Sequence, residues 1–260
     1  MSALCLLHGF TGHPASFQKV LAQLPLQTRV VCPVLPGHDG SEPSPGAAPD
    51  FQSAVDRLAD ELRAAHLGPL HLCGYSLGAR VALGLLVSHP ELFAGATLIS
   101  VHPGLTDPAE RRERAAADER WAALLQDQGL AEFLQQWARQ PLFATQAALP
   151  AAVLAAQDAV RRRHSATGLA LALRVLGLAQ MPDYAAALPA LRLPVRLVVG
   201  AHDAKFLALA ERAAARLPQA AVVRVPGVGH NVLLEAPDAV CAVLAAPPPP
   251  APAGLPPRFT

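Results

Sequence analysis

Residues 70–86 read LHLCGYSLGARVALGLL, and this stretch decides the fold of the chain. Residues 70–75 are mostly apolar, as in a parallel strand buried on both faces, and residues 77–88 carry apolar side chains at helical spacing. Between them lies Gly74-Tyr75-Ser76-Leu77-Gly78, a G-x-S-x-G motif at a strand-to-helix junction. Such a turn projects the serine hydroxyl above the sheet, and the flanking glycines remove side chains that would clash. We therefore predict that Ser76 carries the chemistry.

Short apolar runs and longer helical patterns alternate on both sides of this stretch. We expect strands at residues 4–8, 29–34, 70–75, 96–101, 193–200 and 221–226, and helices at residues 16–24, 51–66, 77–88, 206–217 and 232–244. Because strands separated by helices pair in parallel through right-handed crossovers, the pattern predicts an α/β protein with a mostly parallel, doubly wound sheet.

The alternation stops between about residues 103 and 187. This stretch has no convincing strand, is rich in Ala, Leu, Gln and Arg, and contains both tryptophans. We predict a helical cap (residues 103–187) inserted into a core of residues 1–102 and 188–246, since ligands of such sheets bind beyond the carboxyl ends of the strands. A longer structural excursion is the alternative. Residues 247–260 are rich in proline, and we expect an extended, mobile tail.

The composition limits the possible functions. The chain has 260 residues, of which 52% are hydrophobic and 16% charged, and its net charge is +1. This excludes intrinsic disorder and a protein that binds nucleic acid or anionic membranes through its overall charge. There is no run of 18 apolar residues, and residues 1–8 lack the basic start and cleavage site of a signal peptide. We expect a cytoplasmic protein without a membrane span.

Motifs for cofactors and metals are missing from the sequence. It contains no P-loop, no dinucleotide-binding fingerprint and no H-E-x-x-H, and its four cysteines show no C-x-x-C spacing. We predict no cofactor and no metal ion. The cysteines are expected to be small buried hydrophobes, with a zinc site or disulfides as the alternative.

A serine hydroxyl needs a neighbour that takes its proton, and the expected chain order of the partners is acid, then histidine. Asp203 follows the strand at 193–200, and His230 follows the next strand in a loop with two glycines. We predict that both side chains meet Ser76. The alternatives are that Asp203 caps the following helix and that His230 is a packed loop histidine. Asp39 and Asp107 are weaker candidates for the acid because they lie in turns away from a strand end.

The turn after the first strand reads His8-Gly9-Phe10. Next to a serine on such a sheet, this turn supplies one backbone N–H of an oxyanion hole, and the residue after the serine supplies the other. We predict the N–H groups of Phe10 and Leu77 for this role. His8 is expected to be a structural turn residue, and His202 a neighbour of the acid in its loop.

Together these motifs resemble the α/β-hydrolase superfamily over nearly the whole chain, with a sheet that starts at the superfamily's third strand. A narrower resemblance is to the 2-succinyl-6-hydroxy-2,4-cyclohexadiene-1-carboxylate synthases of menaquinone biosynthesis. It is carried by residues 74–80, His102-Pro103-Gly104-Leu105, residues 110–120, Trp137 with Gln140-Pro141, residues 203–206 and residues 229–231.

The resemblance implies a lyase that eliminates pyruvate from 2-succinyl-5-enolpyruvyl-6-hydroxy-3-cyclohexene-1-carboxylate. The Ser-His-Asp triad would then remove a ring proton instead of forming an acyl-enzyme. A small-molecule carboxylesterase of the same fold is the alternative, and a ligand-binding receptor on this scaffold is a third. The implied partner is a small substrate with several carboxylates, and the oligomeric state is open.

Such a substrate requires fixed cations, and arginine suits carboxylates best. Arg80 lies one helical turn after Ser76 on the same helix face. By resemblance, Arg114 and Arg161 bind carboxylates from the cap, although Arg162 or Arg163 could take the place of Arg161. The alternatives are a salt-bridged Arg80 and solvated surface charges for the cap arginines.

Two aromatic side chains complete the predicted pocket. By resemblance, Trp137 packs against the ring of the ligand and Tyr75 lies beside the pocket. Packing of Trp137 within the cap is the alternative.

Overall fold

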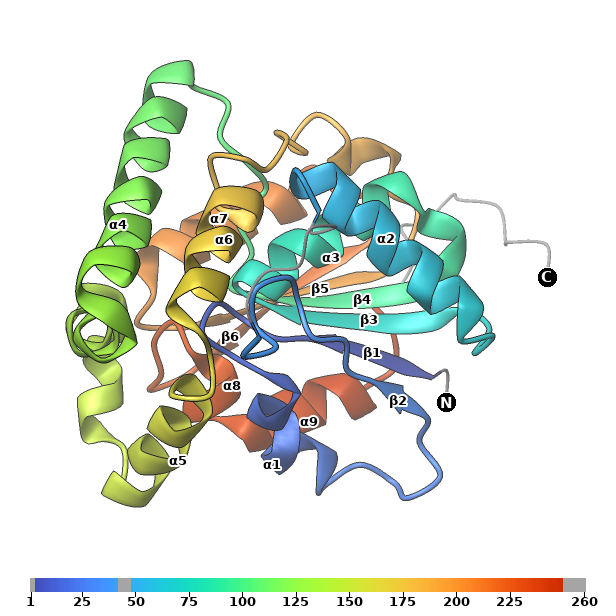
Figure 1. The fold of residues 1–260 in the computed structure, drawn as a ribbon. Helices are drawn as coiled ribbons and strands as arrows, with labels where there is room; N and C mark the ends of the chain where they lie inside the picture. The colour runs from blue at the N-terminus through green and yellow to red at the C-terminus, as the bar shows by residue number, and fades with distance from the viewer. Residues whose placement is uncertain (1–2, 42–47, 250–260) are drawn as a thin grey trace.

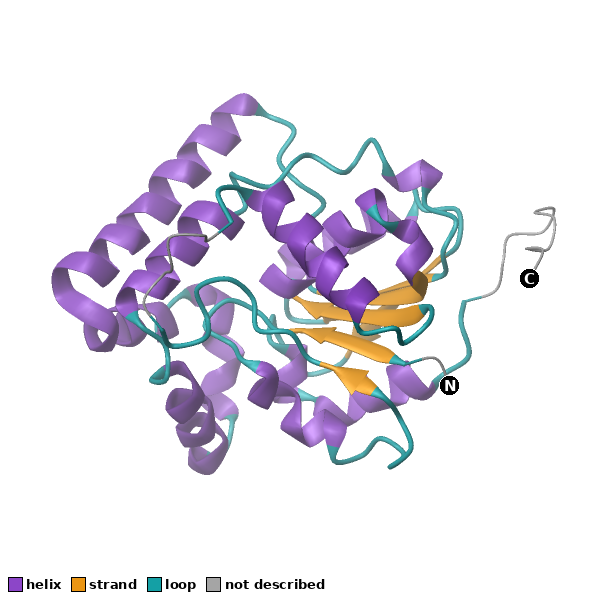
Figure 2. Ribbon diagram, turned by 45° about the vertical axis from the view of Figure 1, so that its right-hand side comes forward, coloured by secondary structure: helices purple, strands orange, loops and turns teal. Residues whose placement is uncertain are grey.

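The computed structural model describes residues 3–41 and 48–249, whose apolar segments form one parallel sheet with helices on both faces (Figure 2). The described sheet has six strands in the order β2-β1-β3-β4-β5-β6. Their bounds are Leu4–Leu7 (β1), Val30–Val31 (β2), Leu70–Tyr75 (β3), Phe93–Ile99 (β4), Val195–Gly200 (β5) and Ala220–Val225 (β6). The predicted doubly wound α/β fold is confirmed.

The strand order creates a crevice at one point of the sheet. From β1 the chain moves outward to β2 at one edge, whereas from β3 it moves through β4 and β5 to β6 at the other edge. Where two neighbouring strands send their connections in opposite directions, a crevice opens at their carboxyl ends. The turns that contain Phe10 and Ser76 follow β1 and β3, so both lie at this crevice.

Helices pack on each face through separate apolar clusters. On one face lie α2 (Phe51–Ala64), α3 (Leu77–Ser88) and α7 (Ala204–Ala214), and on the other lie α1 (Gln18–Leu21), α8 (Val232–Glu235) and α9 (Pro237–Ala245) (Figure 1). In α2 the buried Phe51, Val55, Leu58 and Leu62 recur every three or four residues and form the stripe that faces the sheet.

A helical region is inserted between β4 and β5. It comprises α4 (Pro108–Ala138), a 3-10 segment (Pro141–Ala148), α5 (Ala151–Arg161) and α6 (Ala166–Leu176). Helices α4 and α6 share an apolar cluster that includes Phe133, Leu169 and Leu173. In Figure 2 the strands point toward these helices, which therefore lie over the carboxyl ends of the sheet.

Several predicted bounds were wrong for local reasons. The expected strand at 29–34 pairs only at Val30–Val31, and the strand expected at 96–101 is β4, which ends before Ser100 at a φ of 52°. The expected helix at 232–244 divides into α8 and α9 because Pro237 follows Ala236, whose φ of −142° and ψ of 63° are not helical. The helix expected at 16–24 is a 3-10 turn (Pro14–Phe17) followed by the single turn of α1.

Other expectations concern the surface and the cysteines. Among the described residues, no helix is long and apolar enough to cross a membrane, and no three His, Cys, Asp or Glu side chains are grouped like metal ligands. Cys5 and Cys73 are buried as predicted, Cys32 and Cys241 are partly buried, and all are free thiols. The cytoplasmic location stays a prediction. Most of the predicted tail, residues 250–260, lies outside the described residues.

Candidate active site

Ser76 lies on a strained turn between β3 and α3. Its backbone angles, a φ of 50° and a ψ of −107°, are a combination that residues other than glycine rarely adopt. The turn is held by close backbone contacts: a Cβ on Gly74 would lie 2.4 Å from the carbonyl oxygen of Gly78, and one on Gly78 would lie 2.2 Å from that of Leu7. Only glycine fits at both positions, which explains the motif and fixes the serine at the crevice.

A chain of hydrogen bonds joins Ser76, His230 and Asp203. The Ser76 Oγ and His230 Nε2 atoms are 3.0 Å apart, and His230 Nδ1 lies 2.7 Å from Asp203 Oδ2. A carboxylate only accepts, so Nδ1 carries the ring proton and Nε2 accepts the bond from the serine hydroxyl. His230 is 2% exposed and Asp203 7%, so both groups are shielded from water. The arrangement can move a proton from the serine to the imidazole.

Asp203 has two roles in the structure. While Oδ2 accepts the bond from His230, Oδ1 accepts a 3.3 Å hydrogen bond from the N–H of Phe206 and caps α7. The two sequence interpretations of Asp203 therefore hold together, because the cap fixes the carboxylate that orients the imidazole. Asp107 caps α4 through the N–H of Ala109 and lies outside this hydrogen-bond chain.

The loop of His230 is held by a residue that the sequence analysis missed. The two carboxylate oxygens of Glu235 accept hydrogen bonds from the N–H of Gly229 at 2.8 Å and of Asn231 at 3.2 Å. The hydroxyl of Ser100 donates to the carbonyl oxygen of His230 at 2.9 Å. A glutamate five residues after the histidine, in the first turn of the next helix, is the signal that could have found this clamp.

Ser76 and His230 line a cavity of about 290 Å³ beneath the inserted helices. Phe10 and Leu77, predicted to supply the oxyanion hole, line the same cavity. So do most of the predicted ligand-binding side chains, namely Tyr75, Arg80, Arg114 and Trp137. The structure thus brings together residues that are up to about 220 positions apart in the sequence.

Arg80 points a buried cation into this cavity. It is 8% exposed, and its Nη1 donates to the carbonyl oxygen of Leu176 at 2.7 Å. Burial and the nearby cation of Arg114 lower the pKa of Arg80, but a guanidinium stays protonated at neutral pH. No described carboxylate forms an ion pair with Arg80. Asp118 acts on Arg80 only through space, so the buried guanidinium can still gain from a direct contact with an anionic ligand.

Arg114 is held by a second residue that the sequence analysis did not identify. Its Nε donates to Asp118 Oδ1 at 2.9 Å, one turn further along α4. Asp118 is 5% exposed and its Oδ2 has no hydrogen-bond partner among the described residues. Burial raises the pKa of Asp118, and Arg114 opposes this shift. The Arg114 side chain is 37% exposed and that of Asp118 6%, so Arg114 reaches from a buried carboxylate to solvent, and its binding role stays a prediction.

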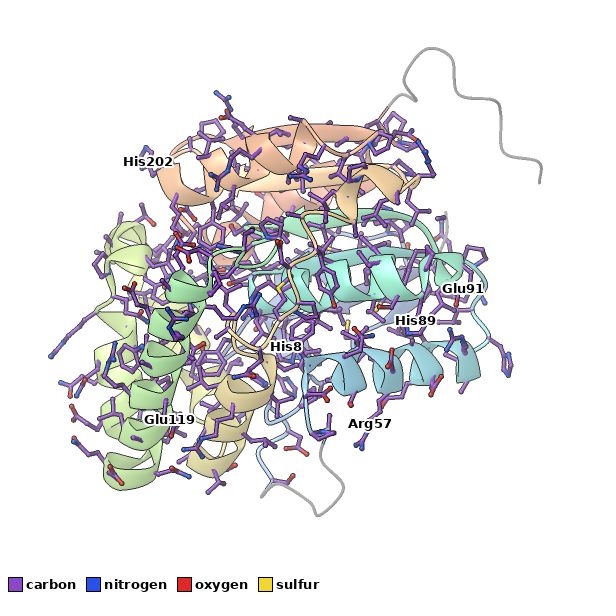
Figure 3. The ribbon with its side chains drawn as sticks, turned by 90° about the horizontal axis from the view of Figure 1, so that it is seen from above. His8, Arg57, His89, Glu91, Glu119 and His202 are labelled. Atoms are coloured by element: carbon purple, nitrogen blue, oxygen red, sulfur yellow. The ribbon has the colours of Figure 1, made fainter. Side chains whose placement is uncertain are left out.

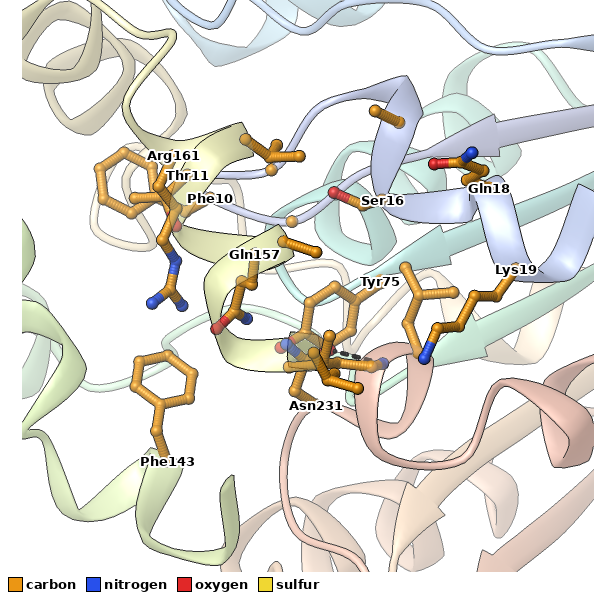
Figure 4. Close-up of a pocket in the computed structure, with 18 residues that line it drawn as sticks. Phe10, Thr11, Ser16, Gln18, Lys19, Tyr75, Phe143, Gln157, Arg161 and Asn231 are labelled. Atoms are coloured by element: carbon orange, nitrogen blue, oxygen red, sulfur yellow. Dashed lines mark hydrogen bonds between the residues drawn. The ribbon is translucent and has the colours of Figure 1, made fainter. Parts of the chain in front are cut away.

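Arg161 lies in a second, adjoining cavity of about 160 Å³ that shares Phe10, Tyr75 and Phe143 with the first (Figure 4). Its guanidinium group lies 5.8 Å from the centre of the Phe143 ring. Arg161 is 8% exposed, whereas Arg162 and Arg163 are exposed, and Arg162 pairs with Asp158 at 2.5 Å. Of the three predicted candidates, Arg161 is therefore the one that lines a cavity.

Trp137 belongs to an aromatic cluster as well as to the cavity wall. Its ring stacks on Phe133 at 5.4 Å and meets Phe10 and Trp121 edge-on at 5.1 and 5.3 Å. Its buried Nε1 has no hydrogen-bond partner among the described residues. The packing interpretation holds, and the contact of Trp137 with the cavity leaves the ligand interpretation open.

His8 and His202 take no part in the hydrogen bonds between Ser76, His230 and Asp203. His8 is fully buried, and its Nε2 accepts from the N–H of Leu35 at 3.1 Å, which ties the turn after β1 to the turn after β2. Figure 3 shows His8 within the molecule and His202 at its periphery. His202 is exposed, as expected for a neighbour of the acid.

The chain is similar to known proteins over most of its length. A model of the alpha/beta hydrolase family matches residues 6–243. The 2-succinyl-6-hydroxy-2,4-cyclohexadiene-1-carboxylate synthase of Enterobacter sp. (strain 638) is 37% identical over 93% of this chain and 90% of its own. The structure of MenH from S. aureus aligns with a TM-score of 0.87 at 27% identity, over 94% and 91% of the two chains. A thermophilic esterase from Thermogutta terrifontis shares the fold, with a TM-score of 0.78 at 24% identity over 94% and 88%.

Proposed function

Because the chain belongs to the alpha/beta hydrolase family and is related to these synthases, we propose that it is a carbon–oxygen lyase. It eliminates pyruvate from 2-succinyl-5-enolpyruvyl-6-hydroxy-3-cyclohexene-1-carboxylate and releases 2-succinyl-6-hydroxy-2,4-cyclohexadiene-1-carboxylate. The observation that carries this proposal is a serine–histidine–aspartate chain that opens on the same cavity as the unpaired Arg80. A proton-transfer device beside a buried cation suits a substrate with several carboxylates.

The proposed mechanism begins with removal of a ring proton. His230, oriented by Asp203, takes the proton of the Ser76 hydroxyl while Ser76 Oγ takes the proton from the ring carbon. The electron pair of the broken C–H bond at C2 forms a C2=C3 double bond, the existing C3=C4 pair moves to C4=C5, and the bond from C5 to the enolpyruvyl oxygen breaks. The leaving enolate gains a proton and becomes pyruvate. Serine and histidine return to their first protonation states.

In this proposal the other predicted residues bind the substrate and stabilise the negative charge that develops on it. The N–H groups of Phe10 and Leu77 hold the oxyanion that develops as the proton leaves. Carboxylates of the substrate bind Arg80, Arg114 and, through the second cavity, Arg161. Tyr75 and Trp137 pack along the ring, and residues 103–187 act as the cap that covers the reaction.

Pyruvate release from the cyclohexene substrate tests the proposal directly. The purified protein is expected to accelerate release far above the spontaneous elimination, and Ser76→Ala is expected to lose about 10³-fold or more in kcat. A matched Ser53→Ala control, at a half-buried serine in the first turn of α2, should leave the rate unchanged. Release at the spontaneous rate by the wild-type protein would overturn the proposal.

A carboxylesterase is the second candidate, because the Ser76–His230 distance of 3.0 Å also suits attack on an ester. The two activities separate at Arg80. Loss of its contact with an anionic substrate should cost Arg80→Ala about 1.5–3 kcal/mol, or roughly 10–150-fold in kcat/KM. Hydrolysis of a neutral activated ester should barely change. A burst of ester cleavage without pyruvate release would favour the esterase.

A further inference from the structure

His102 lines the candidate active site and has no role in the steps above. It follows β4 and lines the cavity of about 290 Å³ that contains Ser76. It also lines an adjoining cleft of about 640 Å³. The His102 ring is 8% exposed and meets Phe206 edge-on at 6.4 Å. His102 is therefore one of the residues shared by the cleft and the cavity, together with Arg114, Leu178 and Lys205.

The backbone fixes which ring nitrogen of His102 carries the proton. The N–H of Gly104 donates to His102 Nδ1 at 3.2 Å, so in the neutral ring the proton resides on Nε2. The turn has little freedom, because Gly104 has a φ of 121° and a Cβ there would lie 2.7 Å from the carbonyl oxygen of Pro182. No hydrogen bond joins His102 Nε2 to a described residue, and Nε2 is not among the buried side-chain atoms that lack a partner, so it faces open space. This N–H group is a donor without a protein acceptor.

The surroundings of His102 keep the ring neutral. Burial, together with the cations of Lys205, Arg80, Arg114 and Arg212, lowers the pKa of His102 to about 4. At neutral pH the ring therefore adds no charge to this group of cations, but it still offers a directed donor. Cations attract an anion over a long range, whereas a single N–H group fixes the orientation of one oxygen atom.

We propose that His102 binds the substrate by donating a hydrogen bond from Nε2 to a carboxylate oxygen held beside Arg80 and Arg114. The ligand class is a carboxylate, since an acceptor-only group can satisfy an N–H donor and two cations at once. This inference rests on the proposed lyase function for the identity of the substrate. It assigns to His102 the orientation of the carboxylate and not a proton-transfer step.

Three substitutions separate the donor from the shape of the ring. In His102→Gln the side-chain amide nitrogen can occupy the position of Nε2 and restore the donor. In His102→Asn the amide oxygen can replace Nδ1 as the acceptor for Gly104, but no donor reaches the Nε2 position. His102→Phe keeps a ring without any donor. His66→Asn, at an exposed histidine whose φ of 48° suits asparagine, is the matched control.

Pyruvate release and product binding are measured for each variant. We expect KM for the cyclohexene substrate to rise about ten-fold or more in the Asn and Phe variants with kcat within about three-fold, and the Gln variant to stay near wild type. Titration of Ser76→Ala protein with the cyclohexadiene product, followed by calorimetry, should give the same order of Kd values. Thermal melting of each variant reports whether it folds.

The outcomes distinguish the two proposals. If wild-type protein releases no pyruvate but the product binds with an affinity that depends on the His102 donor, the lyase function fails and the role of His102 stands. If pyruvate is released and folded Asn, Phe and Gln variants all match wild type, the role of His102 is overturned. Equal losses in all three variants also overturn it, because they would report the ring and not the donor.

Discussion

The direction of each hydrogen bond between Asp203, His230 and Ser76 is fixed by the bond before it. Asp203 can only accept, so His230 must donate from Nδ1 and accept at Nε2. Asp203 is itself fixed by its bond from the N–H of Phe206. The site is therefore preorganised for proton transfer, and this preorganisation depends also on the residues that hold the three side chains in place.

The Glu235 clamp gives a first prediction at this scale. In Glu235→Ala the N–H groups of Gly229 and Asn231 lose a charged acceptor, and the His230 loop should loosen. We expect kcat to fall about 10–100-fold with KM within about two-fold, since the substrate contacts remain. Steady-state pyruvate release measures both parameters. An unchanged kcat, or a loss matched by Glu61→Ala on the exposed side of α2, would contradict the clamp.

Arg161 and Arg162 are adjacent in the sequence, but one is buried and the other exposed, and this difference gives a second prediction. Arg161 is buried beside Phe143, whereas Arg162 pairs with Asp158 in solvent. Arg161→Ala should raise KM for the polycarboxylate substrate about ten-fold or more, and Arg162→Ala should leave it within about two-fold. The comparison needs only initial rates. Equal effects of the two substitutions would show that the second cavity does not bind a carboxylate.

The residues of the proton-transfer chain could be predicted from the sequence because each stands in a recognisable position after a strand. Ser76, Asp203 and His230 follow β3, β5 and β6, and the structure brings them together. Glu235 and Asp118 could not be predicted in the same way. Glu235 accepts hydrogen bonds from two backbone N–H groups, and Asp118 accepts one from the side chain of Arg114. No sequence motif marks these contacts, because they depend on how the chain packs in three dimensions.

At the scale of elements, α4 is two helices joined at a bend. Gly129 interrupts it with a φ of 79° and a ψ of 176°, and a Cβ at this position would meet no atom within 4 Å. The first part carries Arg114 and the second part carries Trp137, and both side chains reach the same cavity. The bend therefore brings two different kinds of side chain to one site.

Substitution of Gly129 isolates the conformational contribution of this bend. Gly129→Ala meets no steric obstacle, so its cost is that of a backbone conformation essentially restricted to glycine, about 1–3 kcal/mol. For a domain of this size we expect the Tm to fall by roughly 2–12 °C. Thermal denaturation followed by circular dichroism measures this shift. Equal melting temperatures for glycine and alanine would show that the bend is not strained.

The elements differ in how well the sequence predicted them. The bounds of β3 and α3 were predicted correctly because a buried apolar run and a glycine-flanked turn define them. The edge strand β2 was overestimated because an apolar run does not reveal how many residues find a partner strand. The break between α8 and α9 has a local cause in Pro237, but the helical spacing of the apolar residues continues through it.

At the scale of the whole molecule, buried neutral histidines set how stability depends on pH. Burial lowers the pKa of His8, His71 and His102 from 6.5 to about 4, and it also lowers the pKa of His38. The unfolded chain binds protons at these rings from about pH 6.5 downward, whereas the folded chain does so only near pH 4. Protons bound only by the unfolded state favour unfolding, so stability must fall as the pH drops through this window.

The expected loss is large. Each histidine shifted from 6.5 to about 4 contributes on the order of 3 kcal/mol that is present above pH 6.5 and lost by pH 4. Urea denaturation at pH 7.5, 6, 5 and 4 should show a steep decline in the free energy of unfolding. His71→Gln, in which the amide can still bond Thr97, should flatten the decline. A free energy that is constant between pH 7.5 and 4 would contradict this account.

The bend in α4 also folds the helix back on itself, so its two arms pack against each other. Trp121 on the first arm meets Trp137 on the second edge-on at 5.3 Å, and Ala122 and Leu125 share an apolar cluster with Phe133 and Leu134. A substitution at Trp121, which does not line the cavity of Ser76, should therefore still change the shape of that cavity by shifting Trp137. The preference of this site for one ligand over another is thus coupled to packing well outside its wall.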